Sequence, residues 1–308
     1  MSVSRSIAFG SLAVLAAASA SGQALQVNTN NDASTLVDVL LGDGITLVGT
    51  PSFTGDAAAA GVFSGGEAAG LGFESGIILS SGDVTGAVGP NDTQGFGDNL
   101  GPVSGDGFAA LEGFNGGGNT NDAAVLSFDF VSDGGDLFFN YVFASEEYDE
   151  FVGSQFNDVF AFLVNGENVA LVPGSQDFVS INTVNNGDGG GNEPASNPNF
   201  FRDNGNGSID VQFDGLTTVL RVEATNLAAG NNNITLAIAD TADSILDSAV
   251  FLQAETFSDV VVPPTPVDPV DPVDPVDPID PPTTVIPTPS AAAAGLLLLA
   301  GVARRRRG

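Results

Sequence analysis

The sequence predicts an all-β domain, an antiparallel β-sandwich for which a jelly roll is one topology. Three observations support this fold class: short runs rich in Phe and Val, alternation of apolar and polar residues within several runs, and Gly, Asn and Asp between them. Hydrophobic residues make up 43% of the 308-residue chain and include 22 Phe, so a substantial core can form. A short N-terminal helix, a disordered or polyproline II stalk and two terminal apolar segments complete the prediction.

The first 23 residues are typical of a signal peptide. Arg5 precedes a short apolar run, and a small-x-small pattern ends at Ala20, where cleavage is expected. A buried N-terminal helix is the alternative.

Residues 24–259 are expected to form the β-sandwich domain. A helix is predicted over residues 33–41, where Leu36, Val37, Leu40 and Leu41 share one face. Strands are predicted over residues 125–130, 137–143, 159–164, 208–214, 233–239 and 249–257.

A stalk is predicted over residues 260–286. Five Val/Ile-Asp-Pro units fall between residues 267 and 281, and Pro at every third position excludes a helix and favours polyproline II. Such a stalk lifts a domain away from a surface.

Residues 287–308 have the composition of a sorting signal. Pro287, Thr288 and Pro289 precede an apolar stretch of 13 residues, shorter than the ~20 that span a bilayer, and four Arg follow it. This arrangement resembles the PEP-CTERM signal, although that family usually has Pro-Glu-Pro where this chain has Pro-Thr-Pro. The resemblance implies transient membrane insertion and processing by an exosortase-type protease, and a permanent membrane anchor is the alternative.

The charge balance restricts the functions that the chain can have. It carries 38 acidic and 7 basic residues, with no Lys, His or Cys. Nucleic acid is excluded as a partner because a phosphate backbone requires a positive surface. The absence of His and Cys removes the commonest bases and nucleophiles, so we expect no enzymatic activity. Cations, or ligands bridged by cations, are the expected partners.

An acidic link joins two predicted strands over residues 144–158, and a second acidic turn follows residue 239. Structureless links of about 15 residues are uncommon and often functional. Ca²⁺ takes 6–8 oxygen ligands, so one ion could neutralise several of these carboxylates. The predicted Ca²⁺ ligands are Glu146, Glu147, Asp149, Asn157, Asp158, Asp243 and Asp247.

Two other interpretations of the acidic link stay open. The carboxylates could be solvated loop residues, or Glu146, Glu147 and Asp158 could cleave glycosides as acid–base pairs. The chain has no Trp and only two Tyr, which leaves few rings on which a sugar could stack. A weaker signal starts at Asp203, where oxygen-bearing residues alternate as in an EF-hand and Asp214 matches the twelfth position by count alone.

Several segments together resemble the choice-of-anchor L domain of bacterial surface proteins, most specifically "NYVFASEEYDEFVGSQFNDVFAFLVNG" and "IADTADSILDSAVFL". The resemblance implies an exported, surface-displayed β-rich domain and supplies no activity. We therefore expect a non-catalytic surface domain that acts in adhesion or extracellular matrix. Ca²⁺ would either stabilise the domain or bridge it to a ligand, which could be a polysaccharide or another surface protein. A secreted carbohydrate-active enzyme and a structural coat protein are the alternatives.

Overall fold

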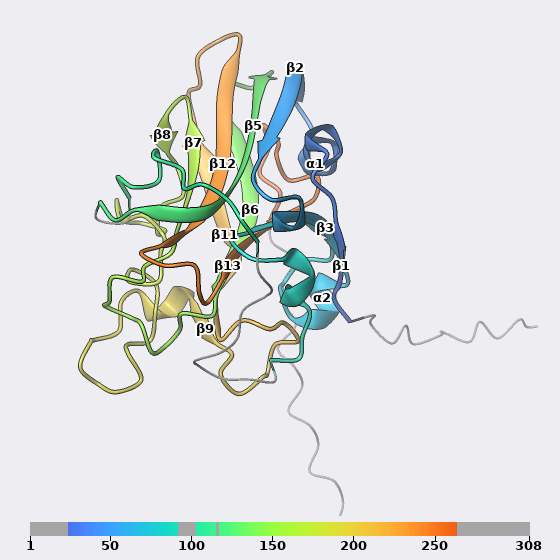
Figure 1. Ribbon diagram of the computed structural model, residues 1–308. Coiled ribbons are helices and arrows are strands. Elements are labelled where there is room, and N and C mark those ends of the chain that lie inside the picture. Colours follow the sequence, from blue (N-terminus) through green and yellow to red (C-terminus); the bar gives the residue numbers. More distant parts are fainter. Residues whose placement is uncertain (1–23, 92–102, 115–116, 264–308) are drawn as a thin grey trace, which may run out of the picture. The chain divides into compact units, whose positions relative to one another are not determined.

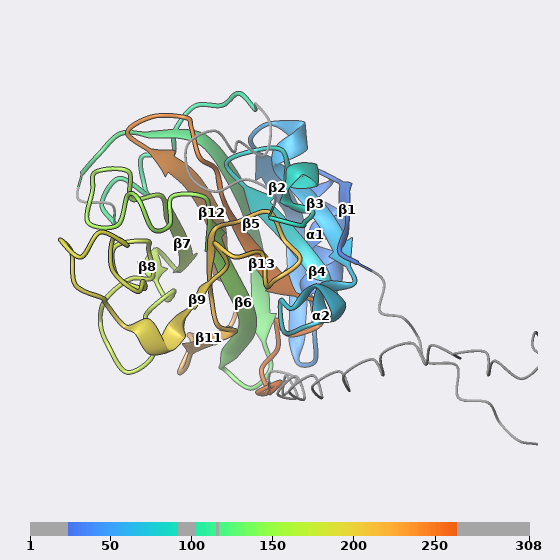
Figure 2. The same ribbon diagram turned by 90° about the horizontal axis from the view of Figure 1, so that it is seen from below.

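Two antiparallel sheets pack as a sandwich in the computed structural model, which describes residues 24–91, 103–114 and 117–263. Figure 1 shows the five-stranded sheet from β8 at the left to β2 at the right, and Figure 2 shows β1, β3 and β4 side by side in the other sheet. The predicted all-β sandwich is therefore confirmed.

The strand orders place distant parts of the sequence side by side. The five-stranded sheet runs β2 (Ile45–Thr54), β5 (Thr120–Ser132), β12 (Asn232–Thr241), β7 (Val159–Val164) and β8 (Glu167–Asn168). The eight-stranded sheet runs β1 (Gln26–Thr29), β3 (Ala60–Ser64), β4 (Gly76–Ser80), β13 (Ser248–Gln253), β6 (Leu137–Ser145), β10 (Gly215–Thr217) and β9 (Phe201–Asp203), and β11 (Leu220–Ala224) also pairs with β6.

Helices in the described residues are few and short. The predicted N-terminal helix is α1 (Ala33–Leu40), which starts where the Asp32 carboxylate accepts a hydrogen bond of 2.8 Å from the Thr35 amide. It buries Leu36, Val37 and Leu40 against the sandwich. The others are α2 (Gly66–Ala69) and three 3₁₀ turns, Ala57–Ala59, Val84–Ala87 and Pro198–Phe200.

Aromatic side chains join the two sheets. Phe139 on β6 lies 5.1 Å from Phe162 on β7, between ring centroids, and Tyr141 lies 5.0 Å from the same ring, edge to face. Such pairs contribute about 0.5–1.5 kcal/mol each beyond the apolar area that they bury. The strands β6 and β7 are apolar on both faces because their outer faces are also covered, by separate apolar clusters that contain Val142 and Ala161.

The prediction of a strand over residues 208–214 is wrong. The segment forms a loop with only an isolated bridge between Val88 and Val211. The side chain of Asn204 provides hydrogen bonds that a neighbouring strand would otherwise provide. It accepts a hydrogen bond from the Ile209 amide and donates to the carbonyls of Val211 and Phe213. The apolar residues of the segment are buried as the alternation indicated, but without strand pairing. The last strand also ends earlier than predicted, at Gln253.

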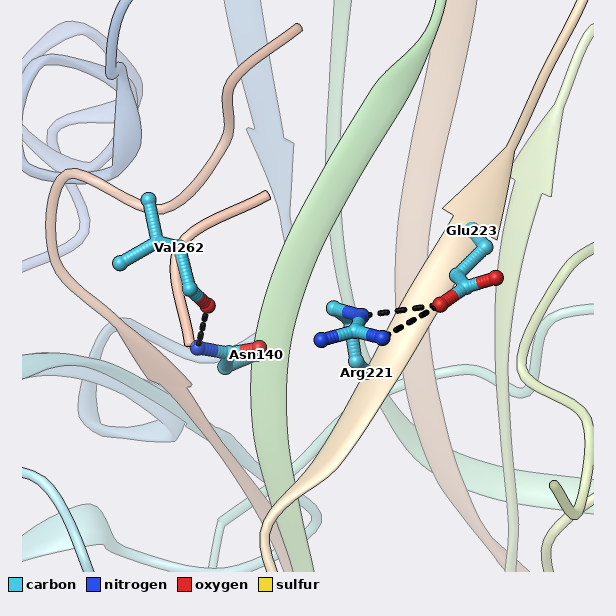
Figure 3. Close-up of polar contacts among 4 residues, drawn as sticks. All are labelled: Asn140, Arg221, Glu223 and Val262. Carbon is cyan, nitrogen blue, oxygen red and sulfur yellow. Dashed lines mark hydrogen bonds and ion pairs between the residues drawn. The ribbon is translucent and has the colours of Figure 1, made fainter. Parts of the chain in front are cut away.

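The chain leaves the sandwich against β6 (Figure 3). Asn140 donates from Nδ2 to the Val262 carbonyl at 3.0 Å and to Gln253 Oε1 at 2.9 Å. Contacts to the domain therefore continue three residues beyond the predicted boundary at residue 259. On the neighbouring β11, Arg221 pairs with Glu223 at 2.6 Å, two positions along the same strand and so on the same face.

No helix among the described residues is long and apolar enough to cross a membrane. The predicted signal peptide with Ala20, most of the stalk, and the sorting signal with Pro287, Thr288 and Pro289 lie outside the described residues.

Candidate functional site

Acidic side chains gather at one end of the sandwich, where strands of both sheets end or begin. Glu146 and Glu147 directly follow β6 of the eight-stranded sheet, and Asp247 directly precedes β13 of the same sheet. Asp158 directly precedes β7 of the five-stranded sheet, and Asp240 lies near the end of β12. The backbone joins these ends, because the Glu146 amide donates to the Asp247 carbonyl at 3.2 Å.

These acidic side chains are buried. The exposed fraction is 1% for Glu146 and Asp240, 2% for Glu147 and Asp158, and 4% for Asp247. Solvated loop carboxylates, one of the alternatives at the level of sequence, would be exposed. The burial therefore contradicts that interpretation for these five residues, although Asp243 is only half-buried.

Hydrogen bonds from the protein satisfy one carboxylate of the cluster. Asp158 accepts from the Thr241 amide at 2.9 Å and from the Ser248 hydroxyl at 2.7 Å. The two hydroxyls of Ser248 and Ser145 also lie 2.9 Å apart, and Ser145 Oγ accepts from the Glu147 amide at 3.0 Å. A chain of hydroxyls thus links Asp158 to the start of the acidic link.

Other carboxylate oxygens of the cluster lack such partners. Oε2 of Glu147 is buried without a hydrogen-bond partner among the described residues. Both carboxylate oxygens of Asp240 are also buried without a hydrogen bond of ordinary geometry, although the Ser81 hydroxyl interacts with this carboxyl and lowers its pKa. A buried polar atom left unsatisfied costs about 1–3 kcal/mol, and more when it is charged. These oxygens therefore require a proton, a buried water molecule, a cation or a ligand.

Burial and mutual repulsion raise the pKa values of the cluster. The pKa of Glu147 rises to about 10, mainly through burial and then through the charges of Asp158 and Asp243. Burial raises the pKa of Asp158 to about 7, although hydrogen bonds from Ser248 and Thr241 oppose the rise. The pKa of Asp240 is also well above its ordinary value, because of burial and the charges of Asp158 and Asp247, with the Ser81 hydroxyl acting in the opposite direction.

Neither Arg of the described residues neutralises the cluster. The guanidinium of Arg202 donates to the main-chain carbonyls of Thr217, Gly70 and Leu71. Arg221 forms its ion pair with Glu223. With no Lys or His in the chain, the described residues supply no side-chain cation to these carboxylates.

The structure brings together five of the seven predicted ligands. Glu146, Glu147, Asp158 and Asp247 are buried at the same end of the sandwich, and Asp243 acts electrostatically on Glu147 and Asp158. Asn157 is engaged elsewhere, since its Oδ1 accepts from the Asn182 amide at 2.9 Å.

Asp149 belongs to a second acidic group. It lines a cavity of about 320 Å³ together with Asp203 and Asp214, the two ends of the EF-hand-like segment. Burial and the charges of Asp203, Glu150 and Asp214 raise its pKa to about 6. Asp214 is held by Asn91, which donates to its carboxylate at 2.8 Å.

Asp240 is the buried acid that the predicted ligand set omits. Asp240 ends the run "NITLAIAD", and the alternation of that run does not indicate that the side chain lies near the acidic link. Among the described residues, no group of three or more acidic side chains is already arranged to hold a metal ion. Ion binding would therefore require the carboxylates to close in around the ion.

Comparison with known proteins places the chain in a family. The profile of the choice-of-anchor L domain matches residues 26–258, which include both sheets and the whole acidic cluster. The chain belongs to the choice-of-anchor L domain family. Choice-of-anchor L domains are typical of exported, anchored surface proteins. No curated protein and no solved structure matches the chain significantly.

Proposed function

We propose that this choice-of-anchor L protein is a non-catalytic surface domain that acts in adhesion or extracellular matrix and is stabilised by Ca²⁺. Its ion site would be the cluster of Glu147, Asp158, Asp240 and Asp247, with Asp243 at its edge. Family membership supports the location, and the buried carboxylates support the ion.

One observation carries the calcium proposal: Asp240 and Glu147 hold buried oxygens without hydrogen bonds of ordinary geometry, and no described side-chain cation serves them. Two carboxylates about 4 Å apart repel each other by roughly 4 kcal/mol at an effective dielectric of 20. A hard divalent ion with oxygen ligands relieves several such repulsions at once. Because the carboxylates come from strand ends of both sheets, the ion would also tie the two sheets together.

The ion could serve a ligand as well as the fold. Ca²⁺ keeps water in some of its 6–8 positions, and a hydroxyl of a polysaccharide or a carboxylate of another surface protein can replace that water. An exported domain on an extended stalk would present such a ligand site away from the cell.

Catalysis fits the geometry less well. Both oxygens of Asp158 accept hydrogen bonds from the protein, which leaves this carboxylate poorly placed to act as a base. Glu147 borders a small cavity with apolar walls, and a glycoside requires polar partners for its hydroxyls. Glycan cleavage that Glu147→Gln abolishes would instead support the carbohydrate-active alternative.

The sorting proposal rests on the sequence of the tail. Processing by an exosortase-type protease at the segment around Pro287, Thr288 and Pro289 would follow transient insertion of the apolar stretch.

Cell attachment tests the proposed role. Cells that display the wild-type chain, the Asp240→Asn variant or the Glu67→Gln control are compared in Ca²⁺ and in a chelator. Glu67 is an exposed acid of α2, on a separate helix. We expect attachment to require Ca²⁺ and to fall in Asp240→Asn alone. Equal attachment of all three strains in both media would contradict a calcium-dependent adhesive role.

A further inference from the structure

A small apolar cavity opens beside the acidic cluster. Its volume is about 220 Å³, which is below the range of about 300–1,000 Å³ typical of pockets for drug-sized ligands. Two of its walls are aromatic rings packed edge to face, with centroids 5.2 Å apart. The cavity is lined by Glu147, Phe151, Phe156, Asp243, Ile245 and Leu246.

The cavity combines carbon walls with two carboxylates. Glu147 is 2% exposed, and its Oε2 has no hydrogen-bond partner among the described residues, so it can accept one from a bound group. Asp243 accepts a long hydrogen bond of 3.2 Å from the Ile245 amide at Oδ1. A ligand that fits must therefore carry both hydrogen-bond donors with positive charge and an apolar body.

A lysine side chain has this combination of properties. Its ammonium group has three donors, and its four-carbon stem packs along apolar surface while the charge stays in a polar environment. The faces of Phe151 and Phe156 can also attract a cation through their ring quadrupoles. A quaternary ammonium has no donor for Glu147, and a bare Ca²⁺ ion would find too few oxygens in this cavity.

The acidic cluster can balance the charge of such a cation in addition to that of a metal ion. Glu147, Asp158, Asp240, Asp243 and Asp247 are five acidic groups, and burial raises the pKa values of Glu147, Asp158 and Asp240, so a cation that binds there displaces protons. One divalent ion balances two ionised carboxylates, and the other acidic groups can ionise for a second cation. Of these five groups, Glu147 and Asp243 line the cavity, so a second cation bound there would lie beside these two carboxylates.

The chain itself cannot supply this group, because it contains no Lys. Its two Arg in the described residues are engaged with main-chain carbonyls and with Glu223. We propose that the cavity bounded by Glu147, Phe151 and Asp243 binds a lysine side chain of a different protein on the cell surface. This inference rests on the proposed role in adhesion and names the chemistry of one partner.

Titration with single amino-acid derivatives tests the inference. Chemical shifts of the purified protein are followed by NMR as Nα-acetyl-lysine amide is added, in EDTA and again in Ca²⁺. We expect saturable shifts centred on the residues that line the cavity. The Nε-acetylated derivative, which keeps the shape and loses the charge, should cause none. Equal shifts with both derivatives, no shifts with either, or tighter binding of the trimethylated lysine derivative would overturn the proposal.

Variants of the cavity make the test specific. Glu147→Gln removes the charge of the carboxylate. Ile245→Ala shortens one wall of the cavity with little risk to the fold, because the Ile245 side chain is 55% exposed. We expect the lysine derivative to bind about tenfold more weakly or worse to Glu147→Gln, and also more weakly to Ile245→Ala, with no change in Glu67→Gln. Unchanged binding in both cavity variants would overturn the proposal. Thermal stability in Ca²⁺ is measured on the same samples, so a failure of lysine binding is distinguished from a failure of calcium binding.

Discussion

The Ser248 hydroxyl donates a hydrogen bond of 2.7 Å to the Asp158 carboxylate and thereby joins the two sheets of the sandwich at their acidic end. Ser248 is the first residue of β13 in the eight-stranded sheet, and Asp158 directly precedes β7 in the five-stranded sheet. Both residues are buried, so the contact is shielded from water and counts for more than an exposed one.

Removing this hydroxyl should weaken the sandwich. Ser248→Ala leaves one oxygen of the buried Asp158 carboxylate without its donor, which costs about 1–3 kcal/mol of unfolding free energy. Urea denaturation measures the loss, and Ser244→Ala is the matched control because Ser244 is exposed. Equal stabilities of the two variants would show that the contact contributes nothing.

The stability of the metal-free protein should fall as the pH rises above about 5. Unfolded carboxyls titrate near pH 4, whereas the folded pKa is about 7 for Asp158 and about 10 for Glu147. Between these values the native state holds more protons than the unfolded chain. The contribution is thus fully present below about pH 4 and is lost as the pH rises towards the folded pKa values.

Calorimetry in EDTA between about pH 5 and pH 8 measures this dependence. Acids with lowered pKa values, such as Asp32 and Asp56, complete their titration below that window and do not mask it. Asp240→Asn should make the slope shallower. A melting temperature that increases with pH in EDTA would mean that the cluster is already ionised and neutralised.

The close approach of Gly82 to Asp247 should make this glycine hard to replace. A Cβ at Gly82 would clash with the Asp247 carboxylate, so the buried side chain would have to move. We expect Gly82→Ala to cost about 1–3 kcal/mol of stability, as overpacking usually does. Gly113→Ala is the control, because a Cβ there meets no described residue within 4 Å. Comparable unfolding curves for the two variants would argue against a fixed Asp247 position.

The C-terminal Arg block should be absent from the displayed protein. The apolar stretch before it is too short for an ordinary membrane span, which favours processing over permanent anchoring. Mass spectrometry of protein shaved or released from the cell surface identifies the terminus. Recovery of surface protein that still carries residues 304–307 would contradict the sorting proposal.

The fold was predictable where a segment's own residues determine its structure. The apolar runs of β6 and β7 indicated central strands, and the shared face of Leu36, Val37 and Leu40 indicated α1. Residues 208–214 show the limit: their alternation correctly indicated which side chains are buried, but a loop organised by Asn204 produces the same burial. The periodicity of apolar residues indicates which side chains face the core, but it does not indicate which segment the backbone pairs with.

The candidate site was predictable in part for a similar reason. Crowded carboxylates around Glu147 predicted a cation site, which stays a prediction, and the structure shows that several of these carboxylates are buried. Asp240 comes close to them only because β12 lies next to β7 in the sheet. Asp149, by contrast, lies two residues from Glu147 and belongs to another acidic group. Strand pairing determines both outcomes, and no local pattern encodes it.

The melting temperature in millimolar Ca²⁺ and in EDTA, at equal ionic strength and neutral pH, tests the calcium proposal most directly. Binding to the native state alone adds about 2.7 kcal/mol at a hundredfold excess over the dissociation constant, which raises the melting temperature by about 5 °C or more. We expect this rise in the wild type and in Glu67→Gln, and a much smaller rise in Asp240→Asn. The same melting temperature in Ca²⁺ and EDTA would contradict the calcium site.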